Sequence, residues 1–144
     1  MLDRILLERK VQQLAHYVEQ LRRFAHLGLQ EFTQDIEKRY AVERVMQLIV
    51  DEAIDINGYV ILASRQAPPK DYYGSFFQMA ALGVYPRSLA VRLAPTTALR
   101  NALVHEYEEV DEREVYRNIS LFLSLYPRYV RQVLAFTSRR THKE

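Results

Sequence analysis

Apolar residues at alternating steps of four and three most constrain how this chain folds. Near the N-terminus they are Leu7, Val11, Leu14, Val18, Leu21 and Ala25. Toward the C-terminus they are Val115, Ile119, Phe122, Tyr126, Tyr129, Val133 and Phe136. This spacing keeps one apolar stripe along a helix and is typical of helices that pack in left-handed bundles. Both ends of the chain are therefore predicted to be helical and to face a common core.

A second, longer helical pattern begins near Glu31 and continues to about Ser64, and Gly28 is expected to end the helix before it. Asn57 and Gly58 weaken its continuity, because asparagine and glycine are poor residues for a helix interior. A pattern of this length is more typical of a helical bundle than of a small globule.

Prolines and glycines divide the middle of the chain into short helices. The segment "RQAPPKDYYG" predicts a loop, after which Asp71 or Ser75 can cap a helix that runs to Leu82. The segment "RSLAVRLAP" predicts another helix that stops before Pro95, because the residue before a proline is pushed out of helical geometry. Thr96 or Thr97 is then expected to cap the next helix.

No segment alternates with period two, and no internal repeat or low-complexity tract is found in the sequence. Pro127 crosses the last helical pattern and is expected to kink or split it, because proline removes a helix hydrogen bond. The sequence predicts one all-α domain over residues 1–144. We expect an up-and-down helical bundle with two long helices, short helices and a motif-bearing helix.

Composition excludes several classes of protein. With 144 residues, 49% of them hydrophobic, the chain is long enough to bury a core and is not disordered. The formal charge of +2 permits an anionic partner at a local patch only. The chain has no cysteine, which excludes disulfides, thiolate metal sites and cysteine nucleophiles. The N-terminal "MLDRILLERKVQQL" has charges in every turn, so we expect a cytoplasmic protein with no membrane partner.

The stretch "LRNALVHEYEEVD" concentrates polar side chains that suit chemistry on a phosphodiester. Arg100 is a permanent cation whose planar fork fits a phosphate, and Asn101 can orient a neighbouring group. His105 can exchange a proton near neutral pH. For an isolated pattern of this kind, a core-edge tyrosine at position 107 beside a solvated histidine is the simpler interpretation.

The angular positions on an ideal helix add a constraint. Arg100 and Tyr107 lie roughly 20° apart, whereas Arg100 and His105 are separated by about 140°. One isolated helix therefore does not direct both side chains at one phosphate without a long reach or a distortion. A second protomer that contributes to the site is expected to help, because two-fold pairing is the commonest route to a symmetric oligomer.

This stretch resembles the signature of the HEPN superfamily, in particular of its HepT-type toxins. Arg100, four intervening residues, His105, any residue and Tyr107 match that motif, and Asn101 is the polar residue that follows the arginine in the family. The family's second helix carries a stretch similar to "DEAIDINGYVI", residues 51–61 here, and the order of long and short helices also agrees.

The resemblance implies an RNA-cleaving toxin that works as a homodimer without metal or other cofactor. His105 is then the general acid or base, Arg100 stabilises charge on the phosphoryl oxygens, and Asn101 holds the phosphate or the imidazole. The substrate is an RNA such as a tRNA or an mRNA. Asp55 could pair with Arg100 and hold its fork, although a solvated helix face explains Asp51 and Asp55 nearly as well.

The resemblance also implies a partner, a small nucleotidyltransferase antitoxin of the MNT type that transfers AMP to the motif tyrosine. Tyr107 occupies that position, and the added phosphate charge and adenosine would block the site and repel RNA.

Two rival functions remain open in the sequence. The chain resembles, in fold, the nucleotide- or substrate-binding half of a split nucleotidyltransferase, which needs no catalytic pair. The second rival function is that of a helical bundle that serves only in assembly.

The aromatic residues Tyr72, Tyr73, Phe76 and Phe77 could stack on bases, but at helical spacing some of them must belong to the core.

Overall fold

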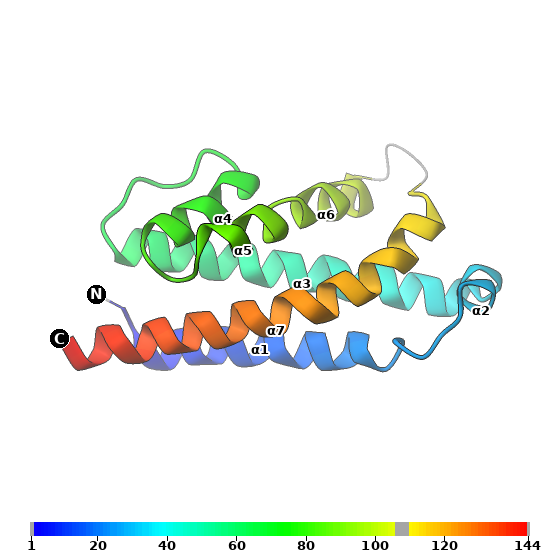
Figure 1. Cartoon of the computed structure of the whole chain (residues 1–144), viewed down its shortest axis with the longest axis horizontal. Helices are drawn as coiled ribbons and strands as arrows, with labels where there is room; N and C mark the ends of the chain where they lie inside the picture. The colour runs from blue at the N-terminus through cyan, green and yellow to red at the C-terminus, as the bar shows by residue number, and fades with distance from the viewer. Residues whose placement is uncertain (1, 106–109, 144) are drawn as a thin grey trace.

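The chain folds into a bundle of α-helices, seen here in a computed structural model that describes residues 2–105 and 110–143 (Figure 1). The helices in chain order are α1 (Arg4–Arg22), α2 (Leu29–Gln34), α3 (Ile36–Ala63), α4 (Tyr72–Ala81), α5 (Arg87–Leu93), α6 (Thr96–His105) and α7 (Glu112–Lys143). No strand is found in these ranges. The predicted all-α class is confirmed.

Three long helices form the body of the bundle. Helix α1 runs in one direction, and α3 and α7 return beside it in the other (Figure 1). The three short helices α4, α5 and α6 follow one another along α3 and together make the return path between α3 and α7 (Figure 1). This order is the predicted up-and-down bundle, with the motif on the last short helix.

The core includes the apolar stripes that the spacing predicts, with one exception. In α1 the buried residues are Leu7, Val11, Leu14, Val18 and Leu21, whereas Ala25, the sixth predicted member, lies beyond the helix and is exposed. In the last helix every member of the predicted stripe is buried, from Val115 to Phe136. The two stripes meet, because α1 packs against both α3 and α7. Removing this apolar surface from water supplies most of the driving force for folding.

Two predicted helix boundaries are wrong, one because of a turn after Arg22 and the other because of a capping side chain at Asp35. Helix α1 ends at Arg22, before Gly28, which instead precedes the first residue of α2. The long second pattern is divided at Asp35, whose extended backbone and side chain begin a new helix. Its Oδ1 accepts a hydrogen bond from the backbone N–H of Lys38 at 3.2 Å, as an N-cap does.

The short helices begin and end close to the predicted residues. Asp71 caps α4, and its Oδ1 accepts a hydrogen bond from the Gly74 N–H at 2.6 Å. Gly83, with φ of +84°, follows the end of α4 in the left-handed region that favours glycine. The hydroxyls of Thr96 and Thr97 donate to the carbonyls of Leu93 and Ala94, so they satisfy the end of α5 instead of capping α6.

Pro127 does not split the last helix, because α7 continues through it from Glu112 to Lys143. The proline is flanked by the buried rings of Tyr126 and Tyr129. Packing of these rings in the core outweighs the one helix hydrogen bond that the proline removes. Helix α3 is likewise continuous through Asn57 and Gly58.

A buried polar network explains why Asn57 is tolerated inside α3. Its Oδ1 accepts a hydrogen bond from the Tyr129 hydroxyl at 2.6 Å, and its Nδ2 donates to Ser75 Oγ at 3.0 Å. Ser75 Oγ in turn donates to the carbonyl of Tyr72 at 2.7 Å. Burial raises the pKa of Tyr129, so its hydroxyl remains a donor throughout the neutral range. The network ties α7, α3 and the first turn of α4 together.

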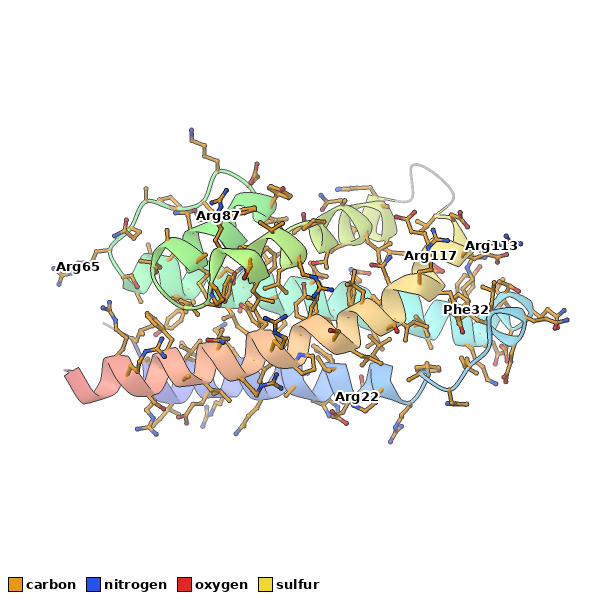
Figure 2. All side chains as sticks on the ribbon, in the orientation of Figure 1. Arg22, Phe32, Arg65, Arg87, Arg113 and Arg117 are labelled. Carbon is orange, nitrogen blue, oxygen red and sulfur yellow. The ribbon has the colours of Figure 1, made fainter. Side chains whose placement is uncertain are left out.

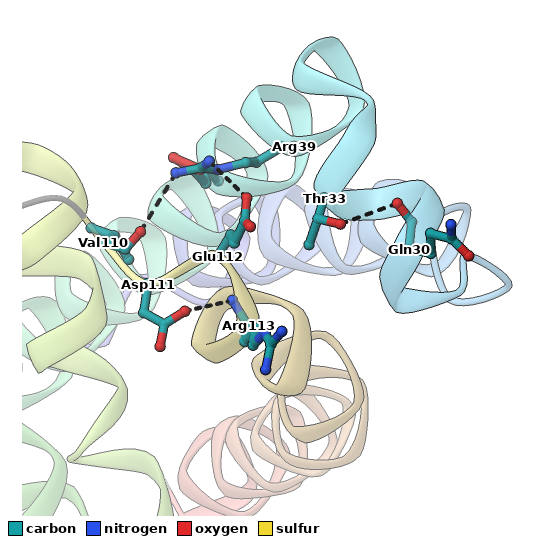
Figure 3. A network of polar contacts seen from close by, with 8 residues as sticks. Gln30, Thr33, Arg39, Val110, Asp111, Glu112 and Arg113 are labelled. Carbon is teal, nitrogen blue, oxygen red and sulfur yellow. Dashed lines mark hydrogen bonds and ion pairs between the residues drawn. The ribbon is translucent and has the colours of Figure 1, made fainter.

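A second set of polar contacts holds the start of α7 against α3 (Figure 3). Arg39 donates to Glu112 Oε2 at 3.1 Å and to the carbonyl of Val110 at 3.5 Å. Arg39 also pairs with Glu43, one turn along α3, at 3.0 Å. The backbone N–H of Arg113 donates to Asp111 Oδ1 at 2.9 Å and begins the helix (Figure 3).

The surface carries its cations at separate places. The labelled arginines 22, 65, 87, 113 and 117 lie on both ends and on different sides of the bundle (Figure 2).

Within the described ranges, no helix is both long enough and apolar enough to cross a membrane.

The buried network gives a prediction about stability. We expect Tyr129→Phe to lower the free energy of unfolding by about 1–3 kcal/mol, because Asn57 Oδ1 loses its donor in a site without water. Urea unfolding followed by circular dichroism measures this change. The control is Tyr40→Phe at a tyrosine that is 59% exposed. Equal stability losses in the two variants would contradict the prediction.

Candidate active site

The motif-bearing helix α6 forms one wall of an open pocket of about 690 Å³. The opposite wall comes from the loop before α4 and from the first residues of α4. The lining residues are Lys70, Asp71, Tyr72, Tyr73, Thr97, Arg100, Asn101, Val104 and His105. Thus the pocket contains the three residues that the sequence predicts to be catalytic, namely Arg100, Asn101 and His105.

Arg100 is held in this pocket by contacts on several sides. Its Nε donates to Asp51 Oδ1 on α3 at 2.6 Å, and its Nη1 donates to Asn101 Oδ1 at 3.2 Å. Its guanidinium carbon lies 5.2 Å from the centre of the Tyr72 ring, a cation–π contact. The side chain is 17% exposed, so most of its length is covered while the fork reaches the pocket. Arg100 is therefore oriented before any ligand arrives.

The predicted pairing of Asp55 with Arg100 is wrong, because Asp51 takes that place. Asp55 pairs with Lys10 on α1, and its side chain is 57% exposed. The two aspartates lie four residues apart on the same side of α3, so the sequence alone cannot decide between them. The decision comes from packing, since α6 crosses α3 beside Asp51, whereas Lys10 of α1 reaches Asp55.

Asn101 and His105 lie on the exposed side of α6 and line the same pocket as Arg100. The separation of about 140° expected on an ideal helix does not keep Arg100 and His105 in different pockets, because both side chains line the same one. Within one chain, both residues therefore border the same space. Tyr107, the predicted modification site, lies outside the described residues.

The charges around Arg100 are close to balanced. Glu52 neighbours Asp51 on α3 and is half-buried, so burial first and Asp55 second raise the pKa of its carboxyl. Lys70 is exposed at the rim of the pocket and Asp71 is engaged in capping α4. In the part of the chain that the structure describes, no three histidine or acidic residues are grouped so as to hold a metal ion.

The sequence did not single out two contributors to the pocket. Asp51 was seen only as a helix neighbour of Asp55, and Lys70 belonged to a loop without a recognised motif. The segment "KDYYG" was the part of the sequence that could have indicated this wall of the pocket. Its helix cap at Asp71 fixes the positions of the two tyrosines that follow. A Cβ at position 74 would lie 2.9 Å from Asp71 Oδ1, so glycine is needed for this tight cap.

Known proteins share this fold over nearly the whole chain. A tri-AMPylated HEPN toxin of Shewanella oneidensis, solved in complex with an MNT antitoxin, superposes with a TM-score of 0.82 at 20% identity and covers 94% of this chain and 99% of that one. YutE of Bacillus subtilis, a cytosolic protein of unknown function, gives 0.83 at 17% identity over 96% of this chain and 92% of that one.

The sequence comparisons are more specific than the fold. A tRNA nuclease HepT from Aphanizomenon flos-aquae is 30% identical over 135 residues, which are 94% of this chain and 92% of that protein. The family model for HepT-like ribonucleases matches residues 14–133 and so includes the motif and the aspartate that orients its arginine. The chain belongs to the HepT-like ribonuclease family.

Proposed function

We propose that this protein is a metal-independent endoribonuclease and the toxin of a toxin–antitoxin pair. The observation that carries the proposal is that Arg100, Asn101 and His105 border one pocket, with the arginine already oriented by Asp51. The family membership and the relative named as a tRNA nuclease support an RNA substrate, a tRNA or an mRNA.

Cleavage uses the 2′-hydroxyl of the RNA as its nucleophile. A base removes the proton of that hydroxyl, the 2′-oxygen forms a bond to the adjacent phosphorus, the bond from phosphorus to the 5′-oxygen breaks, and an acid gives a proton to the departing 5′-oxygen. His105 acts as general acid or base for one of these proton transfers, and no metal is needed to activate water. The products are a 2′,3′-cyclic phosphate and a free 5′-hydroxyl.

Arg100 and Asn101 serve the phosphate. The guanidinium retains donors beyond those given to Asp51 and Asn101, and these can hold the phosphoryl oxygens on which charge builds. Asn101 accepts from Arg100 through Oδ1, which leaves its Nδ2 hydrogens for a phosphate oxygen. Asp51 is a positioning residue, because it acts through the arginine.

The antitoxin in this proposal is an MNT-type nucleotidyltransferase that transfers AMP to Tyr107. Support comes from the Shewanella oneidensis toxin of the same fold, which is tri-AMPylated and complexed with an MNT antitoxin. Tyr107 follows His105 by two residues, so an added nucleotide would bring phosphate charge close to the catalytic histidine. Such charge would repel the RNA backbone. Both partners act in the cytoplasm.

We also infer a homodimer in which the exposed side of α6 faces its symmetry mate. Asn101 and His105 are exposed at that side, whereas Arg100 is largely covered by its own chain. A two-fold axis near α6 would bring two such pockets together into one cleft that stays open to an RNA strand.

The nuclease proposal makes a direct prediction. Purified protein with unmodified Tyr107, checked by mass, cleaves total RNA or tRNA in EDTA, and Arg100→Ala and His105→Ala each lower the rate by at least about a hundredfold. Product ends analysed by mass spectrometry carry a 2′,3′-cyclic phosphate. A 2′-deoxy substitution at the mapped cleavage nucleotide abolishes the reaction.

Circular dichroism and the elution volume of both variants establish that they keep the folded state. Absence of cleavage by the unmodified wild type across total RNA and tRNA contradicts the nuclease. In that case the alternative function, a nucleotide-binding half of a split nucleotidyltransferase, makes a different prediction. The protein then binds a nucleotide, and its expression without the partner does not arrest cell growth.

The two aspartates of α3 offer a matched pair of variants. Asp51→Asn is expected to lower kcat by about tenfold to a hundredfold, because a misplaced Arg100 stabilises the transition state poorly. KM does not rise, since the substitution removes a negative charge beside the phosphate site. Asp55→Asn breaks only an exposed ion pair and leaves kcat within about twofold of wild type. Equal effects of the two variants in single-turnover cleavage would refute the positioning role.

Mixed dimers test whether the site is shared between protomers. Arg100→Ala and His105→Ala chains with different tags are co-expressed, and their heterodimer is purified. A site with arginine from one chain and histidine from the other regains about half of the wild-type activity, because one of its two sites is intact. Heterodimers as inactive as the parent variants show that each chain supplies its own pair.

A further inference from the structure

We propose that Tyr72 and Tyr73 form a stacking site for an unpaired nucleobase next to the scissile phosphate, so that this enzyme selects single-stranded RNA at its cleavage point. The inference rests on the proposed nuclease function and adds the form of RNA that the same pocket recognises. The inference rests on the exposed rings of Tyr72 and Tyr73, which are not part of the core.

The four aromatic residues around the start of α4 fall into two groups. Phe76 is fully buried and Phe77 is partly covered, so these two belong to the core. Tyr72 and Tyr73 are 46% and 49% exposed and both line the pocket with Arg100 and His105. Two neighbouring half-exposed rings in one pocket give a flat ligand an apolar surface on which to stack.

The rings are supported from behind, as a stacking platform must be. Tyr73 packs against Phe77 with ring centres 5.4 Å apart, and the guanidinium of Arg87 covers Phe77 at 4.9 Å. The backbone of Tyr72 is fixed because its carbonyl accepts from Ser75 Oγ at 2.7 Å. Rigid rings lose little conformational entropy when a base stacks on them.

The distance to the phosphate site suits a nucleotide. Tyr72 lies 5.2 Å from the guanidinium carbon of Arg100, so a phosphate on that arginine has its neighbouring base within reach of the rings. Unpaired bases commonly stack on aromatic side chains in RNA recognition. Lys70, on the same rim, can contact the next phosphate along the strand.

The proposed stacking favours an unpaired nucleotide over a regular duplex. A base that stacks on tyrosine must first leave the stack of its own strand, which costs least when it is unpaired. The pocket volume of about 690 Å³ suits one or two nucleotides. The occupant is therefore an unpaired nucleotide of a loop or a strand end.

A fluorescence experiment tests the platform independently of cleavage. Single-stranded oligoribonucleotides that carry 2-aminopurine at each position in turn, made uncleavable by 2′-deoxy substitution, are titrated with the full-length protein. Stacking quenches 2-aminopurine at one position with the wild type. Tyr73→Leu removes this quenching and raises Kd by about tenfold, and Tyr73→Phe, which keeps the ring, restores it. Tyr73 is chosen because Tyr72 also contacts Arg100.

Tyr40→Leu is the matched control, because Tyr40 is an exposed tyrosine that lies outside the pocket. It leaves quenching and affinity unchanged. A duplex of the same sequence binds at least about tenfold more weakly than the single strand. Quenching that persists in both Tyr72→Leu and Tyr73→Leu, or equal affinity for duplex and single strand, overturns the stacking site.

A cleavage experiment then links the base to the tyrosine. An abasic residue beside the mapped cleavage point raises KM for the wild type by about tenfold and has no further effect on Tyr73→Leu, because the same contact is already lost. Additive losses overturn the inference. Quenching that depends on Tyr73 in a protein that cuts no RNA supports the stacking site and contradicts the nuclease, so the two failures are distinguishable.

Discussion

The buried amide of Asn57 is the interaction on which the rest of this structure depends. A polar group in a dry core is tolerated only when its donors and acceptors are matched, and here the matching groups come from two other helices. Tyr129 supplies the donor from α7 and Ser75 the acceptor from α4. The requirement fixes how α4 and α7 are seated on α3, and apolar packing alone would fix this less strictly.

Contacts of Ser75 and Tyr72 connect this arrangement of helices to the candidate active site. Ser75 also donates to the carbonyl of Tyr72, and the ring of Tyr72 lies against Arg100. Asp51, about 9 Å from Asn57 along the same helix, holds the arginine from the other side. About 18 Å farther toward the start of α3, Arg39 ties down the first residues of α7. One long helix thus carries the contacts that position both neighbours of the catalytic motif.

Most of the fold could be predicted because apolar spacing reports directly on which side of a helix is buried. The stripes of α1 and α7 and the short helices between prolines and glycines all follow from that rule. Boundaries at Asp35 and Arg22 were missed, since a single capping carboxylate or an early turn leaves little trace in the apolar pattern. Of the kink or split expected at Pro127, the split did not occur, because the gain from burying two flanking tyrosine rings is tertiary and is not visible in a local pattern.

The sequence predicted three of the residues that line the candidate site, and it predicted the geometry of the site only in part. The residues Arg100, Asn101 and His105 could be recognised because their side chains carry the required functions in one short stretch. The partner of Arg100 could not, because Asp51 and Asp55 are equivalent by spacing and differ only in which helix crosses beside them. The rings of Tyr72 and Tyr73 are indistinguishable from core aromatics until burial is known.

For the RNA binding proposed above, the ion pair between Arg100 and Asp51 also determines how affinity responds to salt. Each phosphate that a protein neutralises on a single strand contributes a slope of about −0.7 to the dependence of log affinity on log salt, through the counterions released. Because Asp51 already balances Arg100, and Asp71 lies beside Lys70, few counterions leave when RNA enters the pocket. Affinity then depends mainly on shape, stacking and directed hydrogen bonds. It is retained at ionic strengths that release RNA from proteins with extended basic surfaces.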